Sequence, residues 1–197
     1  MKYYYSVAQD RKVETKIKRS VFITHLHYVE SMKEAKDYIS KIAAEHKTVN
    51  HNCWAYIVGD RGETFHSSDA GEPSGTAGQP MLNVLKKYKM TNIVTVVTRY
   101  FGGVKLGIRG LIDAYGEAVE TAIDKATLKK LVKLEYYQIK TGYEFVEQLK
   151  YQIEQLNATI EDIEYAEKVT IKISIEDHDK EELEKYLKEM EKAGKMK

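Results

Sequence analysis

The 197-residue sequence contains a single cysteine, Cys53, so one chain cannot form an internal disulfide. This excludes the disulfide frameworks of small secreted domains. The sequence also lacks any run of about 18 apolar residues, which excludes a membrane-spanning helix. Charged residues crowd the first segment from Asp10 onward, which excludes a signal peptide. We therefore expect a cytoplasmic protein that does not bind membranes.

Proline is nearly as scarce as cysteine. Both prolines, Pro73 and Pro80, lie in the stretch from Gly59 to Gly116, which also holds ten of the 12 glycines. Glycine and proline mark turns and loops rather than the interiors of helices and strands. Hydrophobic residues make up 43% of the chain, which is enough for a folded core. Any ligand site is therefore expected in this glycine-rich stretch.

The net charge of +1 hides an uneven distribution of charge along the chain. Residues 1–130 carry 20 Lys and Arg against 14 Asp and Glu, whereas residues 131–197 carry 11 against 16. The sequence pattern also changes near residue 130, to short elements rich in Glu, Lys and Ile. We predict two domains, 1–130 and 131–197, of which the basic first domain suits an anionic partner.

Hydrophobic periodicity predicts a mixture of strands and helices in the first domain. The β-branched segment 92–98 is typical of a central strand that is buried on both faces. Ser31 and Glu34 have the spacing of a capping box, which predicts the start of a helix whose buried stripe begins at Met32. The expected strands are 21–29, 52–58, 63–66 and 92–98, and the expected helices are 32–46, 80–90 and 111–126.

The second domain has a different order of elements. We expect strands at 136–141, 159–166 and 169–175, with helices at 143–156 and 180–192. This β-α-β-β-α order predicts a ferredoxin-like domain built on a split β-α-β unit. The fold class of the whole chain is therefore α+β.

The first candidate binding loop is 69–78, DAGEPSGTAG, which leads into a helix. Its glycines, Gly75 among them, let backbone N–H groups converge, and Ser74 or Thr76 could cap the helix, whose N-terminus favours anions. One interpretation is a backbone-lined site for a phosphate or a carboxylate. The alternative is an ordered turn in which Asp69 and Glu72 are themselves the anions that accept those hydrogen bonds.

The second candidate loop is 99–110, RYFGGVKLGIRG, which also precedes a helix. Its cations could contact phosphates, and its two aromatic residues could stack on a base. The alternative is a packed loop with both aromatic side chains in the core and Arg99 paired to Asp69 or Glu72. The candidate binding residues of this loop are Arg99, Tyr100, Phe101, Gly102, Gly103, Lys105 and Arg109.

Catalytic and metal sites find little support in the sequence. His51 and Cys53 lie two apart on one predicted strand and so share a face, but no base is positioned to activate the thiol. His66, Asp69 and Glu72 are spaced by three, yet a loop does not impose the geometry of a metal site. We predict no catalytic residue, no metal and no cofactor.

The chain resembles the IMPACT/YigZ family, which includes bacterial proteins of this length and a eukaryotic regulator of translation. The resemblance covers residues 20–126 and is carried by three ordered motifs: His51 to Tyr56 (HNCWAY), Asp69 to Pro80 (DAGEPSGTAGQP) and Arg99 to Gly107 (RYFGGVKLG). His51 and Asn52 of the first motif join the candidate binding residues.

The resemblance implies an N-terminal α/β domain like the second domain of a small-subunit ribosomal protein. It also implies a C-terminal domain like the fifth domain of elongation factor G. Two positions depart from the family pattern. Ala70 stands where the family commonly has a second Asp, which weakens a paired-carboxylate role, and Arg109 stands where the family commonly has Gly.

These observations lead to a functional hypothesis and its rivals. The first is a non-enzymatic, translation-associated regulator that binds RNA, the ribosome or a protein factor of translation through the basic glycine-rich loop. The second is an enzyme or sensor for a small phosphorylated ligand held between the two loops. The third is a protein-interaction module with an exposed apolar patch away from both loops.

Overall fold

The computed structural model describes residues 3–46 and 51–196. The chain divides into two compact units, one that ends at Leu131 and one that begins at Val132. Among the described residues, no helix is long and apolar enough to cross a bilayer. Each unit has its own buried core.

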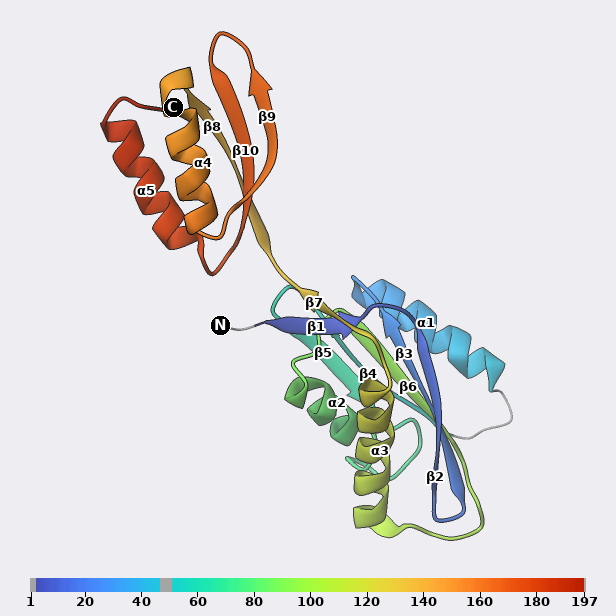
Figure 1. Cartoon of the computed structure of the whole chain (residues 1–197). Helices are drawn as coiled ribbons and strands as arrows, with labels where there is room; N and C mark the ends of the chain where they lie inside the picture. The colour runs from blue at the N-terminus through green and yellow to red at the C-terminus, as the bar shows by residue number, and fades with distance from the viewer. Residues whose placement is uncertain (1–2, 47–50, 197) are drawn as a thin grey trace. The chain divides into compact units, whose positions relative to one another are not determined.

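The first unit contains a five-stranded sheet in the order β2-β3-β6-β4-β5, with every neighbouring pair antiparallel. Helix α1 covers one face of this sheet, and α2 and α3 cover the other (Figure 1). A separate two-stranded ribbon pairs β1 with β7. The elements are β1 (Tyr4–Val7), β2 (Arg11–Ile17), β3 (Ser20–Tyr28), α1 (Met32–Glu45), β4 (Asn52–Val58), β5 (Thr64–Ser68), α2 (Gly78–Lys87), β6 (Ile93–Tyr100), α3 (Gly107–Asp124) and β7 (Leu128–Leu131).

Strand β6 is the centre of this domain, which confirms the prediction for residues 92–98. Its side chains alternate between two cores. Ile93 and Val97 pack with α2 and α3, whereas Val94 and Val96 pack with α1. Because helices cover both faces of the sheet, an antiparallel strand carries the continuous apolar run that is more usual in parallel sheets.

The capping box at the start of α1 is also confirmed. The Glu34 N–H donates to Ser31 Oγ at 3.2 Å, and the Glu34 carboxylate accepts from the Glu30 N–H at 2.8 Å. Met32, however, is 45% exposed, so the buried stripe of the helix begins at Ala35 instead.

The sequence analysis missed β1, β2 and β7. Strand β2 is an edge strand of the sheet, and Lys12, Glu14 and Lys16 along it are exposed while Val13 is buried. A strand with one buried apolar residue and charges on its outer face resembles a solvated segment in composition. Its assignment depends on pairing with β3.

The second unit is a three-stranded sheet in the order β8-β10-β9, with both helices on one face (Figure 1). Strands β8 and β9 both pair antiparallel with β10, so they run parallel to each other, as in a split β-α-β unit. The predicted β-α-β-β-α order is confirmed. The elements are β8 (Leu134–Thr141), a 3₁₀ turn (Tyr143–Phe145), α4 (Val146–Gln155), β9 (Thr159–Tyr165), β10 (Val169–Glu176) and α5 (Lys180–Lys192).

Candidate functional site

Asp69 occupies the anion site that its own loop forms. One carboxylate oxygen accepts from the N–H groups of Ala77 and Gly78, both at 2.9 Å, and the other accepts from the Gly75 N–H at 2.8 Å. Gly78 is the first residue of α2, so these donors belong to the approach and first turn of that helix. A carboxylate of the protein therefore takes the place that an external anion would need.

The pKa of the Asp69 carboxyl reflects this arrangement. Burial alone would raise its pKa, but the hydrogen bonds from Gly75, Ala77 and Gly78 stabilise the ionised form and lower the pKa below its ordinary value. The loop is therefore tied together by a charged group that stays ionised at neutral pH.

The predicted capping roles of Ser74 and Thr76 are wrong. No side chain at the N-cap position of α2 makes a capping hydrogen bond, Ser74 is exposed, and Thr76 Oγ1 donates to the carbonyl of Pro73 at 2.6 Å. Asp69 supplies the acceptors instead. The structural alternative to an anion site thus holds for Asp69, whereas Glu72 accepts from the side chains of Arg99 and Tyr115 instead.

Glu72 and Arg99 form a buried ion pair between the two glycine-rich loops. Arg99 donates to a Glu72 carboxylate oxygen at 2.7 Å, and the two side chains are only 8% and 4% exposed. The same oxygen accepts from the Tyr115 hydroxyl at 2.9 Å. Arg99 therefore has its charge neutralised within the protein.

The aromatic residues that follow Arg99 are not in the core, contrary to the packed-loop alternative. Tyr100 is 38% exposed and Phe101 59% exposed. Tyr100 shares a hydrogen bond of 2.8 Å with His46 Nδ1, and the Phe101 ring centroid lies 5.5 Å from the Arg99 guanidinium carbon. Phe101 thus presents a ring edge or face to solvent beside a buried cation.

Strand β4 and the residue before it hold the 69–78 loop in place. Cys53 Sγ donates to the Asp69 carbonyl at 2.9 Å, and His51 Nδ1 lies 3.0 Å from the Ala70 carbonyl oxygen. The two side chains share a face, as their spacing predicts. Asn52 points to the opposite face, where its amide oxygen accepts from Thr98 Oγ1 at 2.6 Å.

Burial raises the pKa of the Cys53 thiol to about 12, and an unionised thiol is a poor nucleophile. His66, Asp69 and Glu72, the candidate metal ligands, are each engaged elsewhere: the His66 ring lies 5.5 Å from that of Tyr56, while the two carboxylates make the contacts described above. Across the described residues, no cluster of His, Cys, Asp and Glu could hold a metal ion.

Gly102 sets the path of the second loop. A Cβ on Gly102 would lie 1.6 Å from the carbonyl oxygen of Arg19, so no larger residue fits without moving the backbone. The Gly102 N–H is 3.4 Å from Ser20 Oγ. This contact brings the β2–β3 turn against the loop that follows β6. Gly103 (φ +84°) adopts a backbone conformation that favours glycine.

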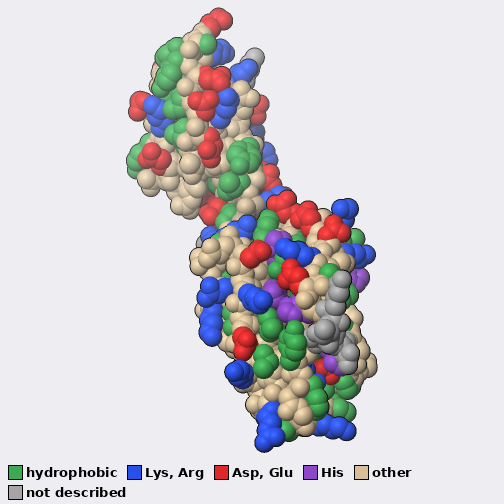
Figure 2. Space-filling view, turned by 90° about the vertical axis from the view of Figure 1, so that its right-hand side faces the viewer, with side chains coloured by type: hydrophobic (Ala, Val, Ile, Leu, Met, Phe, Trp, Pro, Cys, Tyr) green, Lys and Arg blue, Asp and Glu red, His purple; other side chains and the backbone are tan. Residues whose placement is uncertain are grey.

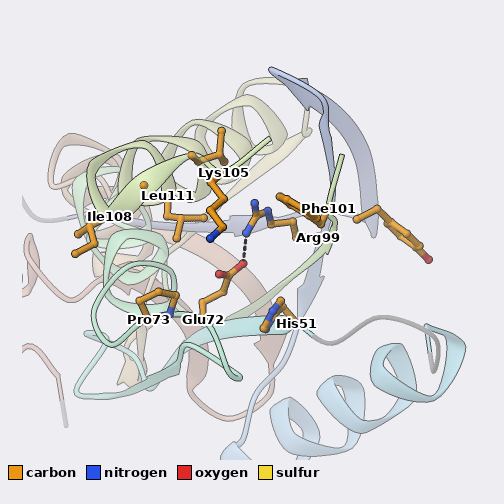
Figure 3. A pocket seen from close by; sticks show the side chains of 11 residues that line it. His51, Glu72, Pro73, Arg99, Phe101, Lys105, Ile108 and Leu111 are labelled. Atoms are coloured by element: carbon orange, nitrogen blue, oxygen red, sulfur yellow. Dashed lines mark hydrogen bonds and ion pairs between the residues drawn. The ribbon is translucent and has the colours of Figure 1, made fainter. Parts of the chain in front are cut away.

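A pocket of ≈ 590 Å³ opens between the two loops and the start of α3 (Figure 3). Side chains of both charge signs lie on it, and Lys105 reaches in toward the Arg99–Glu72 pair. Most of the polar lining was predicted from the sequence, and the apolar wall of Leu106, Ile108 and Leu111 was not. The pocket is lined by His51, Glu72, Pro73, Arg99, Tyr100, Phe101, Lys105, Leu106, Gly107, Ile108 and Leu111.

Lys105 is the cation that the pocket leaves available. Within the described part of the chain it has no ion-pair partner. It precedes α3, whose N-cap, Leu106, makes no side-chain hydrogen bond and whose first turn contains no acidic residue. The positive end of the helix dipole and the Lys105 charge therefore point to the same region, where the carboxylate of Glu72 is already paired with Arg99.

Arg109 does not line the pocket. Its side chain is 87% exposed and pairs with Asp113 one turn along α3, at 3.2 Å. Asp69, Ser74, Gly75 and Thr76 also lie outside the lining. The same holds for Asn52, Gly102 and Gly103. The structure thus gathers six of the predicted site residues: His51, Glu72, Arg99, Tyr100, Phe101 and Lys105.

Further cations lie at the same end of the sheet as Lys105. Lys16, Lys18 and Arg19 are exposed on the β2–β3 hairpin, and pairing of Val21 with Tyr100 places this hairpin beside the end of β6. No Asp or Glu occurs at positions 15–29 or 99–112. Figure 2 shows Lys and Arg side chains at this lower end of the domain. We call Lys16, Lys18, Arg19 and Lys105 the basic end.

Comparisons with known proteins agree with this architecture. Residues 18–123 match the model of the Impact N-terminal domain, and residues 139–190 match that of a domain of unknown function (DUF1949). The chain is similar to the IMPACT family member YvyE of Bacillus subtilis (strain 168), at 34% identity over 187 residues that cover 95% of this chain and 86% of the relative.

Two further relatives extend this finding. The IMPACT family member YigZ of Escherichia coli (strain K12) is 33% identical over 165 residues, covering 83% of this chain and 81% of the relative. A crystal structure of an hypothetical protein superposes with a TM-score of 0.64 at 30% identity, over 100% of this chain and 96% of the other. The chain belongs to the IMPACT family.

Proposed function

We propose that the protein is a non-enzymatic, translation-associated factor that binds RNA on the ribosome or alone through the basic end of its N-terminal domain. Family membership supports the link to translation, since the family includes a eukaryotic regulator of translation. The cytoplasm, where ribosomes work, is the location that this proposal implies. The observation that carries it is the basic end itself, where four exposed cations lie on two neighbouring segments, 15–29 and 99–112, that contain no Asp or Glu.

The contacts at the basic end suit a phosphate backbone. Lys18 and Arg19 lie on a turn that touches Gly102, so they and Lys105 are held on one rigid scaffold. The exposed Phe101 ring lines the pocket together with Lys105 and offers a surface on which a base can stack. Phosphate contacts of this kind give affinity that depends on salt more than on sequence.

The test is RNA and ribosome binding at several salt concentrations for the wild type and for the variant Lys18→Ala/Arg19→Ala/Lys105→Ala. Arg99 and Arg109 are left intact, because each is paired with a carboxylate. If each removed cation contacts one phosphate of a single strand, the slope of log K against log salt falls by about 2. Affinity at moderate salt falls by about tenfold or more.

The matched control removes three exposed lysines from elsewhere, Lys36→Ala/Lys185→Ala/Lys188→Ala, on α1 and α5. It changes the net charge equally and leaves the basic end whole. Equal loss in both variants would show that net charge, rather than this surface, drives binding. A wild-type affinity that does not vary with salt would refute the proposal.

A second candidate function follows from the pocket itself, whose volume is in the range of small-molecule sites. In this alternative the chain is an enzyme or sensor for a small phosphorylated ligand, with the phosphate at Lys105 and the start of α3. Such a ligand raises the melting temperature by mass action, and Lys105→Ala removes that rise. Lys18→Ala/Arg19→Ala leaves the rise unchanged, which separates this alternative from RNA binding.

A further inference from the structure

A second hollow lies at the opposite end of the same domain, where β4 turns into β5 and β6 begins. It has a volume of ≈ 370 Å³ and opens between β1, the β4–β5 turn and the end of α2. Its floor includes Ile57 and Met90, which are buried. A hollow near the lower limit of small-molecule sites, about 300 Å³, holds one compact ligand rather than a chain of several units.

The polar lining of this hollow has one sign of charge. Arg61, Lys86 and Lys89 lie on it, and none of the described lining residues is Asp or Glu. Among the residues that the structure describes, neither Lys86 nor Lys89 has a carboxylate within ion-pair distance. Lys86 and Lys89 therefore bring two like charges to one apolar-floored hollow, and an anion between them would relieve their repulsion.

The main chain fixes the position of Lys89. Its carbonyl accepts from the Tyr5 N–H at 2.9 Å, and its N–H donates to the Lys86 carbonyl at 3.0 Å. Lys89 adopts a left-handed backbone conformation, with φ of +52°. The end of α2 is thereby tied to β1, so the cations and the tyrosines of β1 belong to one rigid wall.

Aromatic side chains line the rest of the hollow. Tyr3 and Tyr4 form part of its wall. Two residues outside the lining contact it: the Lys130 ammonium lies 3.4 Å from the ring centroid of Tyr3, and the Phe65 ring centroid lies 3.4 Å from the Lys86 ammonium. The hollow thus has an apolar floor, tyrosine walls and a rim of cations, which together suit a flat aromatic group that carries negative charge.

We propose that this hollow binds a mononucleotide unit, with its base against the tyrosines and its 5′-phosphate at Lys86 and Lys89. The site shares no residue with the basic end, so it stands or falls independently of the proposed function. Lys86 in the last turn of α2 also offsets the helix dipole, but Lys89 lies outside that helix.

The test is a titration of the full chain with adenosine 5′-monophosphate, followed by amide NMR shifts and by thermal melting. Adenosine and inorganic phosphate are titrated in parallel, because the proposal requires both halves of the ligand. A 5′-phosphorylated trinucleotide distinguishes the end of an RNA strand from a free nucleotide as the source. We expect saturable shifts at residues 57–62 and 86–90. Adenosine alone and phosphate alone should each bind at least about tenfold more weakly than the nucleotide.

The variant Lys86→Gln/Lys89→Gly removes two charges. Glycine is chosen at position 89 because it adopts the left-handed backbone conformation without strain. Its control, Lys87→Gln/Lys125→Gln, removes two nearby charges that do not line the hollow. Nucleotide affinity should fall about tenfold in the first variant and stay unchanged in the control. Saturation at Lys105 instead, equal binding by both variants, or no saturable binding at millimolar nucleotide would overturn the proposal.

Discussion

The two glycine-rich loops of the N-terminal domain have similar composition and opposite roles. In loop 69–78 both carboxylates have partners within the protein. Asp69 accepts three backbone hydrogen bonds, and Glu72 pairs with the buried Arg99. The loop after β6 leaves Lys105 without an ion-pair partner among the described residues and Phe101 exposed. The first loop is therefore held together by its own carboxylates, whereas the second leaves a cation and an aromatic ring exposed.

Breaking the ion pair that joins the loops should have the largest effect. Glu72→Ala leaves Arg99 buried without its carboxylate and removes the acceptor of the Tyr115 hydroxyl. We expect a loss of about 3–5 kcal/mol in the free energy of unfolding, measured by urea denaturation. The double variant Glu72→Leu/Arg99→Met should recover much of this loss, and a double variant as unstable as the single one would contradict an unpaired-charge origin.

Asp69→Asn should have the next largest effect, because one charged acceptor is replaced where three N–H groups converge. We expect a loss of about 2–3 kcal/mol, and a change within about 0.5 kcal/mol for the neighbouring control Ser74→Ala.

The same substitution gives a test of pH dependence. The folded-state pKa of Asp69 lies below its ordinary value of 3.8, so its contribution is present above about pH 4 and is lost as pH falls through the folded-state pKa. The difference in stability between wild type and Asp69→Asn should therefore shrink on acidification. A difference that stays constant down to the acid transition would assign the loss to packing instead.

Ala70→Gly should have a smaller effect in the opposite direction. Ala70 holds a left-handed conformation, with φ of +44°, which is costly for alanine and free for glycine. We expect a gain of about 0.5–1 kcal/mol in the free energy of unfolding by urea denaturation. Ala70 also packs against the core, and an unchanged or lower stability would show that this packing outweighs the strain.

Lys105→Ala should leave stability nearly unchanged and weaken ligand binding alone. Its ammonium has no ion-pair partner in the described chain, so only contacts with a bound anion are lost. The slope of log K against log salt for RNA should fall by about 0.7. If Lys105→Ala lowered the melting temperature as much as Asp69→Asn does, Lys105 would also have a structural role, and the contrast between the two loops would be wrong.

Local features of this fold follow from the sequence, and contacts over long separations do not. The capping box of Ser31 and Glu34 joins residues three apart, and β6 carries its buried character in its own β-branched residues. Arg99 and Glu72 are 27 positions apart, and the alternatives for Arg99 included the wrong partner, Asp69, as well as the right one. Composition alone does not distinguish two carboxylates on one loop.

The pocket between the two loops was likewise only partly predictable from the sequence. The sequence identified Lys105 and Arg109 as equivalent cations, yet Arg109 pairs with Asp113 on the surface of α3 and Lys105 enters the pocket. It also missed the apolar wall of Leu106, Ile108 and Leu111, since such residues early in a helical pattern resemble ordinary core positions.

The sequence by itself determined the α+β class, most of the helices and strands, the two glycine-rich loops and the family resemblance, because these depend on local pattern. Only the tertiary structure decided which charges are used within the protein. Hydrogen bonds and ion pairs require their atoms to approach within a few ångströms, and the sheet register and helix packing bring them together across the chain. This is why Asp69 and Arg99 became structural residues, while Lys105 remains available to a ligand.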